Sequence, residues 1–566
     1  MFYFEYLSTA PAVLSLMLAA SATTRAGSVY PIRPSPSGVQ WGSCPDDLQG
    51  NSTLKVECGT LAVPLDYTSP NKTDTLDLSP VKVPAVKGPA NHSILFNFGG
   101  PGLEARYTLA GLSDTLMAIT GGEHDLIGWD PRGTAETLTF SCFADEATRT
   151  AIEAQSVLGN SSDVAHGQVW AASTNYDEAC AEYTQAQERG PLIGTTFTVR
   201  DAMQIVDAVE SDGLLRYWGF SYGSVIGATL AAMFPDRVEK VVIDGVLNPI
   251  EYFYAHADFQ QFAGTDAAFA EFFRQCVSTP KDCVLAQNYP NETAAQLEAA
   301  TYNLIEEVKY QPIAIEGAIL GYDELQEAIR FLGYSPKLWL SLVSLLDVLL
   351  AEPRNETDII SIITSISNTL GSEFSGANDS PLGIECGDKK PRTASFDVIS
   401  EVFEQLQSVS RLQGDSTVVV PATSAQWPFE PRERYEGRFV NVKPRKPLLV
   451  IGNTYDPATS FQSAQNISET IKGSVLLQHG GFGHASINQP SLCTALAIQN
   501  YFRNGTLPTP NTLCPPTEPP FQYAVSGSWD QLYAELGFHF PGNSSASSRA
   551  KRGNMRSGRK IGNFYV

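Results

Sequence analysis

Residues 214–228 read LLRYWGFSYGSVIGA, in which an apolar run is followed by a serine that stands between two glycines. The apolar run predicts a strand, and the stretch after the serine predicts the start of a helix. Gly219 and Gly223 occupy the positions where such a tight turn has no room for side chains. A turn of this kind lifts the hydroxyl of Ser221 out of the sheet, where a base can reach it. The stretch therefore predicts a nucleophilic serine.

Five more apolar runs occur along the chain, between segments with helical periodicity. They are Ser93–Phe98, Asp125–Trp129, Lys240–Asp244, Pro447–Ile451 and Ser474–Leu477. Short continuous apolar runs are typical of a mostly parallel sheet that helices cover on both faces. Ligand sites in such sheets lie at the carboxyl ends of the strands. The sequence therefore predicts an α/β fold with its functional residues in the loops that follow these strands.

Between about residues 250 and 435 the periodicity becomes mostly helical, with no obvious buried strand. Asp323–Leu332 and Pro336–Leu350 are typical of amphipathic helices, and Glu356–Leu370 and Phe396–Leu412 look similar. This stretch falls between two strands of the predicted sheet. We therefore expect a helical insertion that lies over the strand ends as a lid.

These patterns divide the chain into five predicted segments. The first is a secretory signal peptide, because the apolar segment Ala10–Ala22 ends in a small-x-small cleavage pattern. The segments are the signal peptide at 1–26, a first core part at 27–250, the lid at 251–435, a second core part at 436–540 and a disordered basic tail at 541–566.

Nine cysteines are present, and eight of them form close pairs in the sequence. The pairs are Cys44 with Cys58, Cys142 with Cys180, Cys276 with Cys283, and Cys493 with Cys514. In an oxidising compartment this spacing predicts short-loop disulfides. Many Asn-x-Ser/Thr sites, among them Asn51 and Asn291, are typical of a glycosylated exported protein. We therefore expect a secreted, extracellular protein.

The 566-residue chain has a formal net charge of −23 and a pI near 4.7. Such acidity argues against nucleic acid or an anionic membrane as a partner. The seven histidines are scattered without metal-binding spacing, and no glycine-rich dinucleotide motif opens a helix after a strand. We therefore expect no metal and no cofactor.

A serine hydroxyl becomes an effective nucleophile when a base removes its proton and an acid holds the tautomer of that base. The run 447–451 leads into Asp456, and the run 474–477 leads into a glycine-rich loop with His479 and His484. We assign the acid to Asp456 and the base to His484, because a histidine in such a loop can approach the serine closely. His479, which is nearer the strand end, is the alternative base, and an Asp-Pro turn is the alternative role of Asp456.

Acyl transfer also needs hydrogen-bond donors for the oxyanion. One predicted donor is the backbone N–H of Tyr222, at the start of the helix after the serine. The other should come from the loop after 93–98, where Gly100 is our choice and Gly99 the alternative. A plain glycine turn is the alternative interpretation of this loop.

Together these motifs closely resemble the serine peptidases of the prolyl iminopeptidase and tripeptidyl aminopeptidase group within the α/β-hydrolases. The matching stretches are Gly99–Gly102, Gly128–Gly133, Gly219–Gly223, Ile243–Val246, Asn453–Pro457 and Gly483–Ser486. The segment Cys493–Cys514 looks like the C-terminal segment of the tripeptidyl aminopeptidase branch. The resemblance implies an α/β-hydrolase fold, a triad of Ser221, Asp456 and His484, and release of short peptides from free N-termini.

Two stretches depart from the family pattern. Leu103–Arg106 follows the glycine loop where the family usually has a Gly-Ser-Gly-like stretch, which would alter the lip of the substrate pocket. The family also tends to pair a cysteine in a Cys-x-Asp segment with one upstream of Trp-Pro. Here Cys386 keeps the first position, whereas Ser424 stands three residues before Trp427. We therefore expect Cys386 to be a free, buried thiol.

The leading hypothesis is an exported serine exopeptidase with peptide substrates. Such an enzyme must recognise the substrate's ammonium group with carboxylates, for which Glu104, Glu251 and Asp388 are candidates, although each could be a solvated surface acid. A second hypothesis keeps the triad and makes the protein an esterase or lactonase that acts on a small metabolite. A third is a secreted binding protein built on an inactive hydrolase, against which the complete set of Ser, Asp and His argues.

Overall fold

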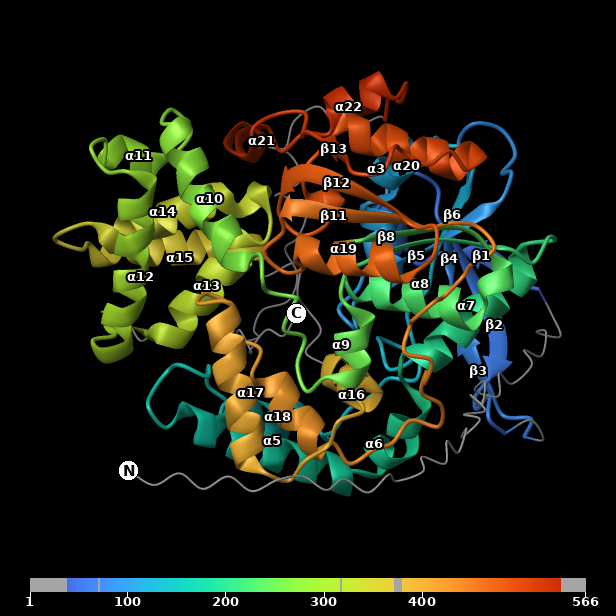
Figure 1. The fold of residues 1–566 in the computed structure, drawn as a ribbon, viewed down its shortest axis with the longest axis horizontal. Coiled ribbons are helices and arrows are strands. Elements are labelled where there is room, and N and C mark those ends of the chain that lie inside the picture. Colours follow the sequence, from blue (N-terminus) through green and yellow to red (C-terminus); the bar gives the residue numbers. More distant parts are fainter. Residues whose placement is uncertain (1–37, 70–71, 316–317, 371–378, 541–566) are drawn as a thin grey trace, which may run out of the picture.

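One large sheet of eleven strands forms the centre of the protein. The computed structural model describes residues 38–69, 72–315, 318–370 and 379–540 (Figure 1). The predicted signal peptide at 1–26 and the predicted tail at 541–566 lie outside the described residues.

Seven neighbouring strands of the sheet run parallel. In spatial order they are β6 (Asp125–Gly128), β5 (Ser93–Asn97), β7 (Leu215–Phe220), β8 (Val238–Asp244), β11 (Leu449–Tyr455), β12 (Val475–Phe482) and β13 (Thr512–Cys514). Every apolar run that predicted a strand is confirmed. Because the strands are parallel, the loops after β5, β7, β8, β11 and β12 meet at one edge of the sheet.

Four antiparallel strands that the sequence analysis did not predict extend the sheet beyond β6. They are β1 (Gln40–Ser43), β2 (Glu57–Pro64), β3 (Thr75–Leu78) and β4 (Val81–Val83). Buried and more exposed side chains alternate in β2 and β4, whereas β1 and β3 are mostly exposed or half-buried, so none of the four has the continuous apolar run of a parallel strand.

Helices cover both faces of the sheet, as the sequence predicts for an α/β fold (Figure 1). One face is covered by α7 (Thr195–Val209), α8 (Tyr222–Met233) and α19 (Phe461–Thr470), and the other by α2 (Ala105–Gly111), α3 (Ser113–Ile119) and α20 (Leu492–Asn504). Alternate residues of one strand belong to the two layers: Leu95 packs into the first apolar core, and Ile94 and Phe96 pack into the second. This order of strands and layers is that of an α/β-hydrolase.

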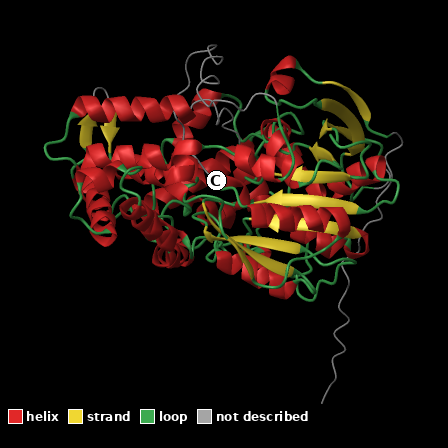
Figure 2. Cartoon of the chain, turned by 90° about the horizontal axis from the view of Figure 1, so that it is seen from above, coloured by secondary structure: helices red, strands yellow, loops and turns green. Residues whose placement is uncertain are grey.

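The predicted insertion between β8 and β11 is helical, and it lies beside the sheet (Figure 2). Its main helices are α10 (Thr265–Ser278), α12 (Ala294–Tyr310), α13 (Tyr322–Gly333), α14 (Trp339–Leu350), α15 (Glu356–Leu370), α16 (Ser380–Asp388), α17 (Phe396–Val409) and α18 (Val419–Gln426). A two-stranded hairpin of β9 (Ile313–Ile315) and β10 (Ala318–Leu320) interrupts them, where only helices were expected.

A helix from outside the predicted insertion also packs against the lid. Helix α5 (Ala165–Glu182) lies between β6 and β7 in sequence, yet its Val169 packs with Phe403 of α17 and Ala422 of α18. The sequence analysis assigned the whole of 27–250 to the core, because the helical periodicity of α5 does not reveal the elements on which it packs.

All four predicted disulfides are present, between Cys44 and Cys58, Cys142 and Cys180, Cys276 and Cys283, and Cys493 and Cys514. Cys386 is free and buried, as expected, and the hydroxyl of Ser424 donates to its Sγ at 2.9 Å. Within the described part of the chain, every helix is too short or too polar to cross a membrane.

Candidate active site

Ser221 stands on a sharp turn between β7 and α8. Its φ is 55° and its ψ is −125°, a conformation that strains an L-residue by about 1–3 kcal/mol. A Cβ on Gly219 would collide with the carbonyl oxygen of Gly223, and a Cβ on Gly223 would lie 2.6 Å from the carbonyl oxygen of Asn97. Only glycine fits on either side of Ser221, as the sequence predicts.

His484 and Asp456 form a buried pair at the same edge of the sheet. Nδ1 of His484 lies 3.0 Å from Oδ1 and 3.1 Å from Oδ2 of Asp456. Three backbone N–H groups, of Ala458, Thr459 and Ala485, and the hydroxyl of Thr459 also donate to this carboxylate. Burial on its own would raise the pKa of Asp456, but His484 and these donors outweigh it and lower the pKa. The carboxylate is therefore ionised at neutral pH.

The second nitrogen of His484 is available. Its Nε2 is buried and has no hydrogen-bond partner among the described residues. A Cβ on Gly245 would lie 3.1 Å from Cε1 of His484, and the preceding residue, Asp244, accepts the N–H of Ser221 at 3.0 Å. The imidazole thus lies beside the strand end that adjoins the serine.

Asp244 links the serine turn to the histidine loop, a role that the sequence analysis did not assign. Its backbone accepts from Ser221, and its buried carboxylate accepts from the N–H of Ser486 at 2.9 Å and from the hydroxyl at 2.5 Å. Burial raises the pKa of Asp244 to about 6. Asp244 lies in a stretch that carried the family resemblance, which was the available signal. For Thr459 no sequence signal existed.

His479, the alternative base, lies within β12 rather than in the loop after it. Its side chain is fully buried, and Nδ1 lies 2.9 Å from the hydroxyl of Thr494 on α20. Burial lowers the pKa of His479 to about 4. The geometry therefore pairs His484, and not His479, with Asp456.

The glycine loop after β5 lies directly against the serine turn. A Cβ on Gly99 would lie 2.7 Å from Cβ of Ser221 and 3.2 Å from the nitrogen of Tyr222. The N–H of Gly99 donates to Oδ1 of Asn97 at 3.0 Å, so that amide already has an acceptor. Of the two glycines, Gly100 thus remains the candidate for the oxyanion.

The three candidate carboxylates lie in different surroundings. Glu104 precedes α2 and is half-buried, and burial raises its pKa. Glu251, in α9 (Pro249–Tyr254), accepts the N–H of Gln260 at 2.8 Å, and burial raises its pKa to about 7.

Asp388 is fully buried. Its carboxylate accepts from the N–H and the hydroxyl of Thr195 and from the hydroxyl of Tyr252, and burial raises its pKa to about 6. Asp388 therefore lies in the core among protein donors and is not a solvated surface acid. Glu104 and Glu251 keep part of their surface exposed.

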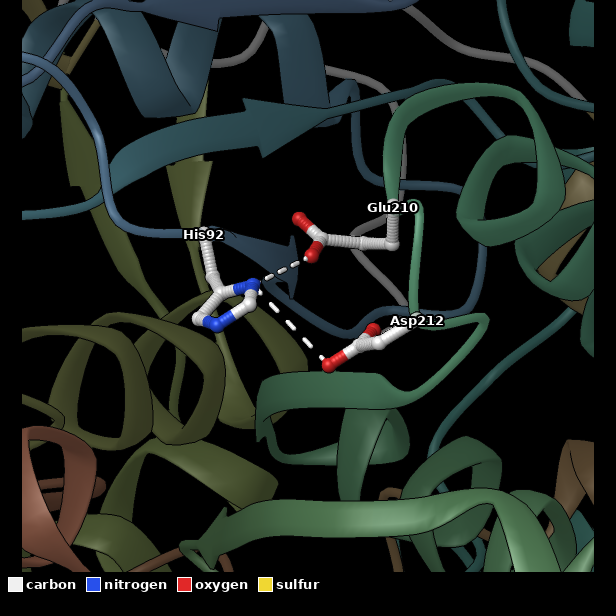
Figure 3. A group of neighbouring side chains, drawn as sticks. All are labelled: His92, Glu210 and Asp212. Carbon is white, nitrogen blue, oxygen red and sulfur yellow. Dashed lines mark hydrogen bonds and ion pairs between the residues drawn. The ribbon is translucent and has the colours of Figure 1, made fainter.

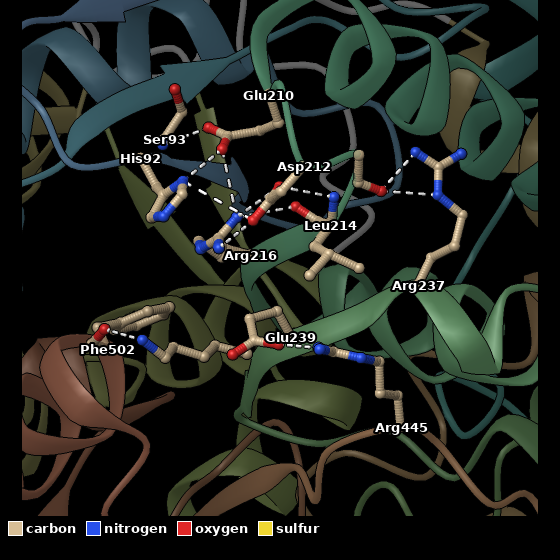
Figure 4. A network of polar contacts seen from close by, with 12 residues as sticks. His92, Ser93, Glu210, Asp212, Leu214, Arg216, Arg237, Glu239, Arg445 and Phe502 are labelled. Atoms are coloured by element: carbon tan, nitrogen blue, oxygen red, sulfur yellow. Dashed lines mark hydrogen bonds and ion pairs between the residues drawn. The ribbon is translucent and has the colours of Figure 1, made fainter.

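A different histidine–carboxylate cluster lies at the opposite edge of the sheet. His92, Glu210 and Asp212 bring potential metal ligands together, the one such group among the described residues (Figure 3). However, the guanidinium of Arg216 donates to Glu210 at 3.2 Å and to Asp212 at 2.8 Å (Figure 4). Arg216 supplies the positive charge that these carboxylates need, so we interpret the cluster as an ion-pair network.

Comparisons with known proteins agree with this architecture. Residues 411–514 match the family described as TAP-like protein. Serine protease Hip1 of Mycobacterium tuberculosis is 26% identical over 494 residues, which cover 84% of this chain and 91% of that protein. Tripeptidyl aminopeptidase of Streptomyces lividans is 24% identical over 519 residues, covering 88% and 90%. Carboxylesterase B of M. tuberculosis is 25% identical over 493 residues, covering 84% and 90%.

Among solved structures, proline iminopeptidase of Mycobacterium smegmatis aligns with 75% of this chain and 91% of its own, at 12% identity and a TM-score of 0.31. Because this TM-score is low, we assign the fold from the order of the strands and the layers of helices in the chain itself. The topology and the similar sequences define the chain as a serine hydrolase with the α/β-hydrolase fold. Within that class its residues 411–514 are similar to TAP-like proteins, and two of its relatives are named as peptidases.

Proposed function

We propose that Ser221, His484 and Asp456 form a catalytic triad. The observation that carries the proposal is the buried His484 imidazole, whose Nδ1 is paired with ionised Asp456 and whose Nε2 has no partner among the described residues. Such a ring has one nitrogen held and the other ready to accept the serine proton. Ser221 attacks the scissile carbonyl, His484 takes that proton and returns it to the leaving amine, and water then hydrolyses the acyl-enzyme.

The oxyanion of each tetrahedral intermediate is stabilised by the N–H groups of Tyr222 and Gly100. Tyr222 is the first residue of α8, where backbone N–H groups have no partner within the helix. The close packing of the glycine loop on the serine turn supports Gly100 as the second donor. One such donor contributes about 3 kcal/mol to the transition state.

The substrate is a peptide with a free N-terminus, from which the enzyme releases short peptides or residues. Similarity to tripeptidyl aminopeptidase and to serine protease Hip1 supports this proposal. Glu104 and Glu251 are the candidates for binding the substrate ammonium group, since both are partly exposed. Asp388 could take this role only if the lid opened its buried site.

The protein acts outside the cell. Four disulfides support an oxidising compartment. The leader that the sequence predicts at 1–26 would direct export.

The experiment is a substrate panel on the purified protein. Tripeptidyl amides, monoaminoacyl amides, their N-acetylated forms and simple esters are compared at equal concentration, together with fluorophosphonate labelling of wild type and Ser221→Ala. We expect labelling that Ser221→Ala abolishes, and hydrolysis of amides that N-acetylation suppresses. Unchanged labelling of Ser221→Ala would disprove the triad.

The second candidate function is that of an esterase acting on a small metabolite. Similarity to carboxylesterase B supports it, as does Leu103–Arg106 after the glycine loop. In the same panel, efficient hydrolysis of simple esters with no turnover of any free-amine peptide would favour this function over the exopeptidase.

A further inference from the structure

A short part of the lid, Tyr334–Trp339, docks on the loop that carries His484. It follows α13 directly and passes through η3 (Pro336–Leu338) to the start of α14. The N–H of His484 donates to the carbonyl oxygen of Tyr334 at 3.0 Å. The Tyr334 and His484 rings have centroids 4.9 Å apart, at an interplanar angle of 59°. One lid residue therefore contacts both the backbone and the imidazole of the proposed base.

The same lid segment also fits closely against the two residues that precede His484. Gly483 has a φ of 86°, and a Cβ there would lie 2.7 Å from Cδ of Pro336. The ring of Trp339 packs edge-on against Phe482, with centroids 5.3 Å apart. The lid thus contacts three consecutive residues of the loop, and glycine at 483 permits this approach.

The core holds the backbone of this loop in other ways. Nδ2 of Asn453 donates to the carbonyl oxygens of Gly483 and Ala485, each at 2.8 Å, and Asn488 donates to the carbonyl oxygen of His484. These bonds hold the chain but not the imidazole. The ring is contacted at Nδ1 by Asp456 and Thr459, and by the aromatic ring of Tyr334.

Tyr334 is held to the lid by the helix that precedes it. Leu325, Ile329 and Leu332 of α13 are almost completely buried in the apolar core of the lid. A displacement of the lid would therefore move Tyr334 away from His484, while Asp456 and Asn453, which belong to β11 and the loop after it, would stay in place.

We propose that Tyr334 is a positioning residue, whose ring and carbonyl hold His484 in the orientation that Ser221 requires while the lid is docked. The inference rests on the proposed function, in which His484 is the base. The lid then contributes to the catalytic geometry as well as to the walls of the substrate site. A base displaced by about 1 Å lowers the rate on the order of 10²-fold.

The test compares Tyr334→Ala, Tyr334→Phe and Tyr310→Ala, the last of which removes an exposed ring at the end of α12. The measurements are kcat and KM on the best substrate of the panel, and the second-order rate constant of fluorophosphonate labelling. We expect Tyr334→Ala to lower kcat and the labelling constant about 10²-fold with little change in KM. Tyr334→Phe, which keeps the ring, and Tyr310→Ala should stay near wild type.

Two results would overturn the inference: wild-type kcat and labelling in Tyr334→Ala, or a rise in KM alone, which would make Tyr334 a wall of the substrate site. If Tyr334→Ala does not fold, Tyr334→Leu takes its place with the same expected losses. His484→Ala in the same series separates the two proposals. Wild-type labelling of His484→Ala refutes the triad, whereas an inactive His484→Ala beside a fully active Tyr334→Ala refutes the role of Tyr334 alone.

Discussion

The two edges of the sheet carry histidine–carboxylate pairs of nearly equal geometry and different chemistry. Nδ1 of His484 lies 3.0 Å from Asp456, and Nδ1 of His92 lies 2.8 Å from Glu210. At the carboxyl edge the histidine is buried and its second nitrogen has no partner among the described residues. At the opposite edge the side chain of His92 is 38% exposed, and Arg216 donates to the same carboxylate.

The difference shows that a short histidine–carboxylate distance does not by itself define a catalytic pair. What distinguishes His484 is its burial and its place at the edge where parallel strands end, next to the turn that carries Ser221. The pair at the other edge connects the start of β5 to the end of α7, because Glu210 also accepts the N–H of Ser93 at 2.5 Å. Its role is structural.

Replacement of each histidine by alanine should produce the largest contrast between the edges. We expect His484→Ala to lower kcat/KM about 10⁶-fold, because no other group would take the serine proton. His92→Ala should leave kcat/KM unchanged and lower the free energy of unfolding by about 1 kcal/mol. Peptidase assays and denaturant unfolding measure the two effects. Equal losses of activity in both variants would contradict the assignment of the edges.

The carboxylates should differ in the same way, with a smaller effect on activity. Asp456→Asn should lower kcat about 10⁴-fold, because an amide no longer holds the required tautomer of His484. Glu210→Gln should keep kcat and lose at most about 3 kcal/mol of stability, since the buried Arg216 loses one of its two carboxylate partners and keeps Asp212. Steady-state kinetics and urea unfolding of both variants check this, and a Glu210→Gln enzyme with lowered kcat would show that the edges are coupled.

Removal of the Thr459 hydroxyl should have a moderate effect on kcat. Thr459→Val keeps the shape and removes the hydroxyl that donates to Asp456 at 2.9 Å, so kcat should fall about tenfold, as for the loss of one hydrogen bond to a charged group. The matched control is Thr494→Val, which removes the hydroxyl beside His479 and should not change kcat. A decrease of kcat in the control equal to that in Thr459→Val would implicate His479 in the reaction.

The lowered pKa of Asp456 predicts a pH-dependent contribution to stability. In the unfolded chain this carboxyl titrates near 3.8, and in the folded protein it stays ionised to lower pH. Its contribution is therefore present above pH 3.8 and is lost as the pH falls through the folded pKa. The difference in Tm between wild type and Asp456→Asn should be largest at neutral pH and shrink near pH 3. A difference that is independent of pH would show that the pairing is not electrostatic.

The smallest expected effect is that of metal ions at the His92 edge. Zinc and EDTA should both leave the Tm of the wild type unchanged, because Arg216 occupies the position of the cation. Thermal unfolding with each additive measures this. A rise in Tm with zinc that disappears in His92→Ala would establish a metal site at this edge.

Much of the fold follows from local sequence patterns. The parallel strands are continuous apolar runs because both of their faces are buried, and the serine turn is marked by glycines that no other residue could replace. The antiparallel strands β1 to β4 were missed, since they are only partly buried and have no continuous apolar run. Helix α5 was assigned to the core, because its partners α17 and α18 lie more than 200 residues away in the sequence.

The sequence by itself determined the turn around Ser221 and the disulfide pairs, because each depends on residues fairly close together in the chain. The tertiary structure decided which histidine meets Asp456, since His479 and His484 are only five residues apart and the end of β12 at Phe482 falls between them. It also decided the contacts of Asp244 with Ser486 and of Tyr334 with His484, which join segments that are distant in sequence. Such contacts depend on packing between elements, and periodicity carries no record of them.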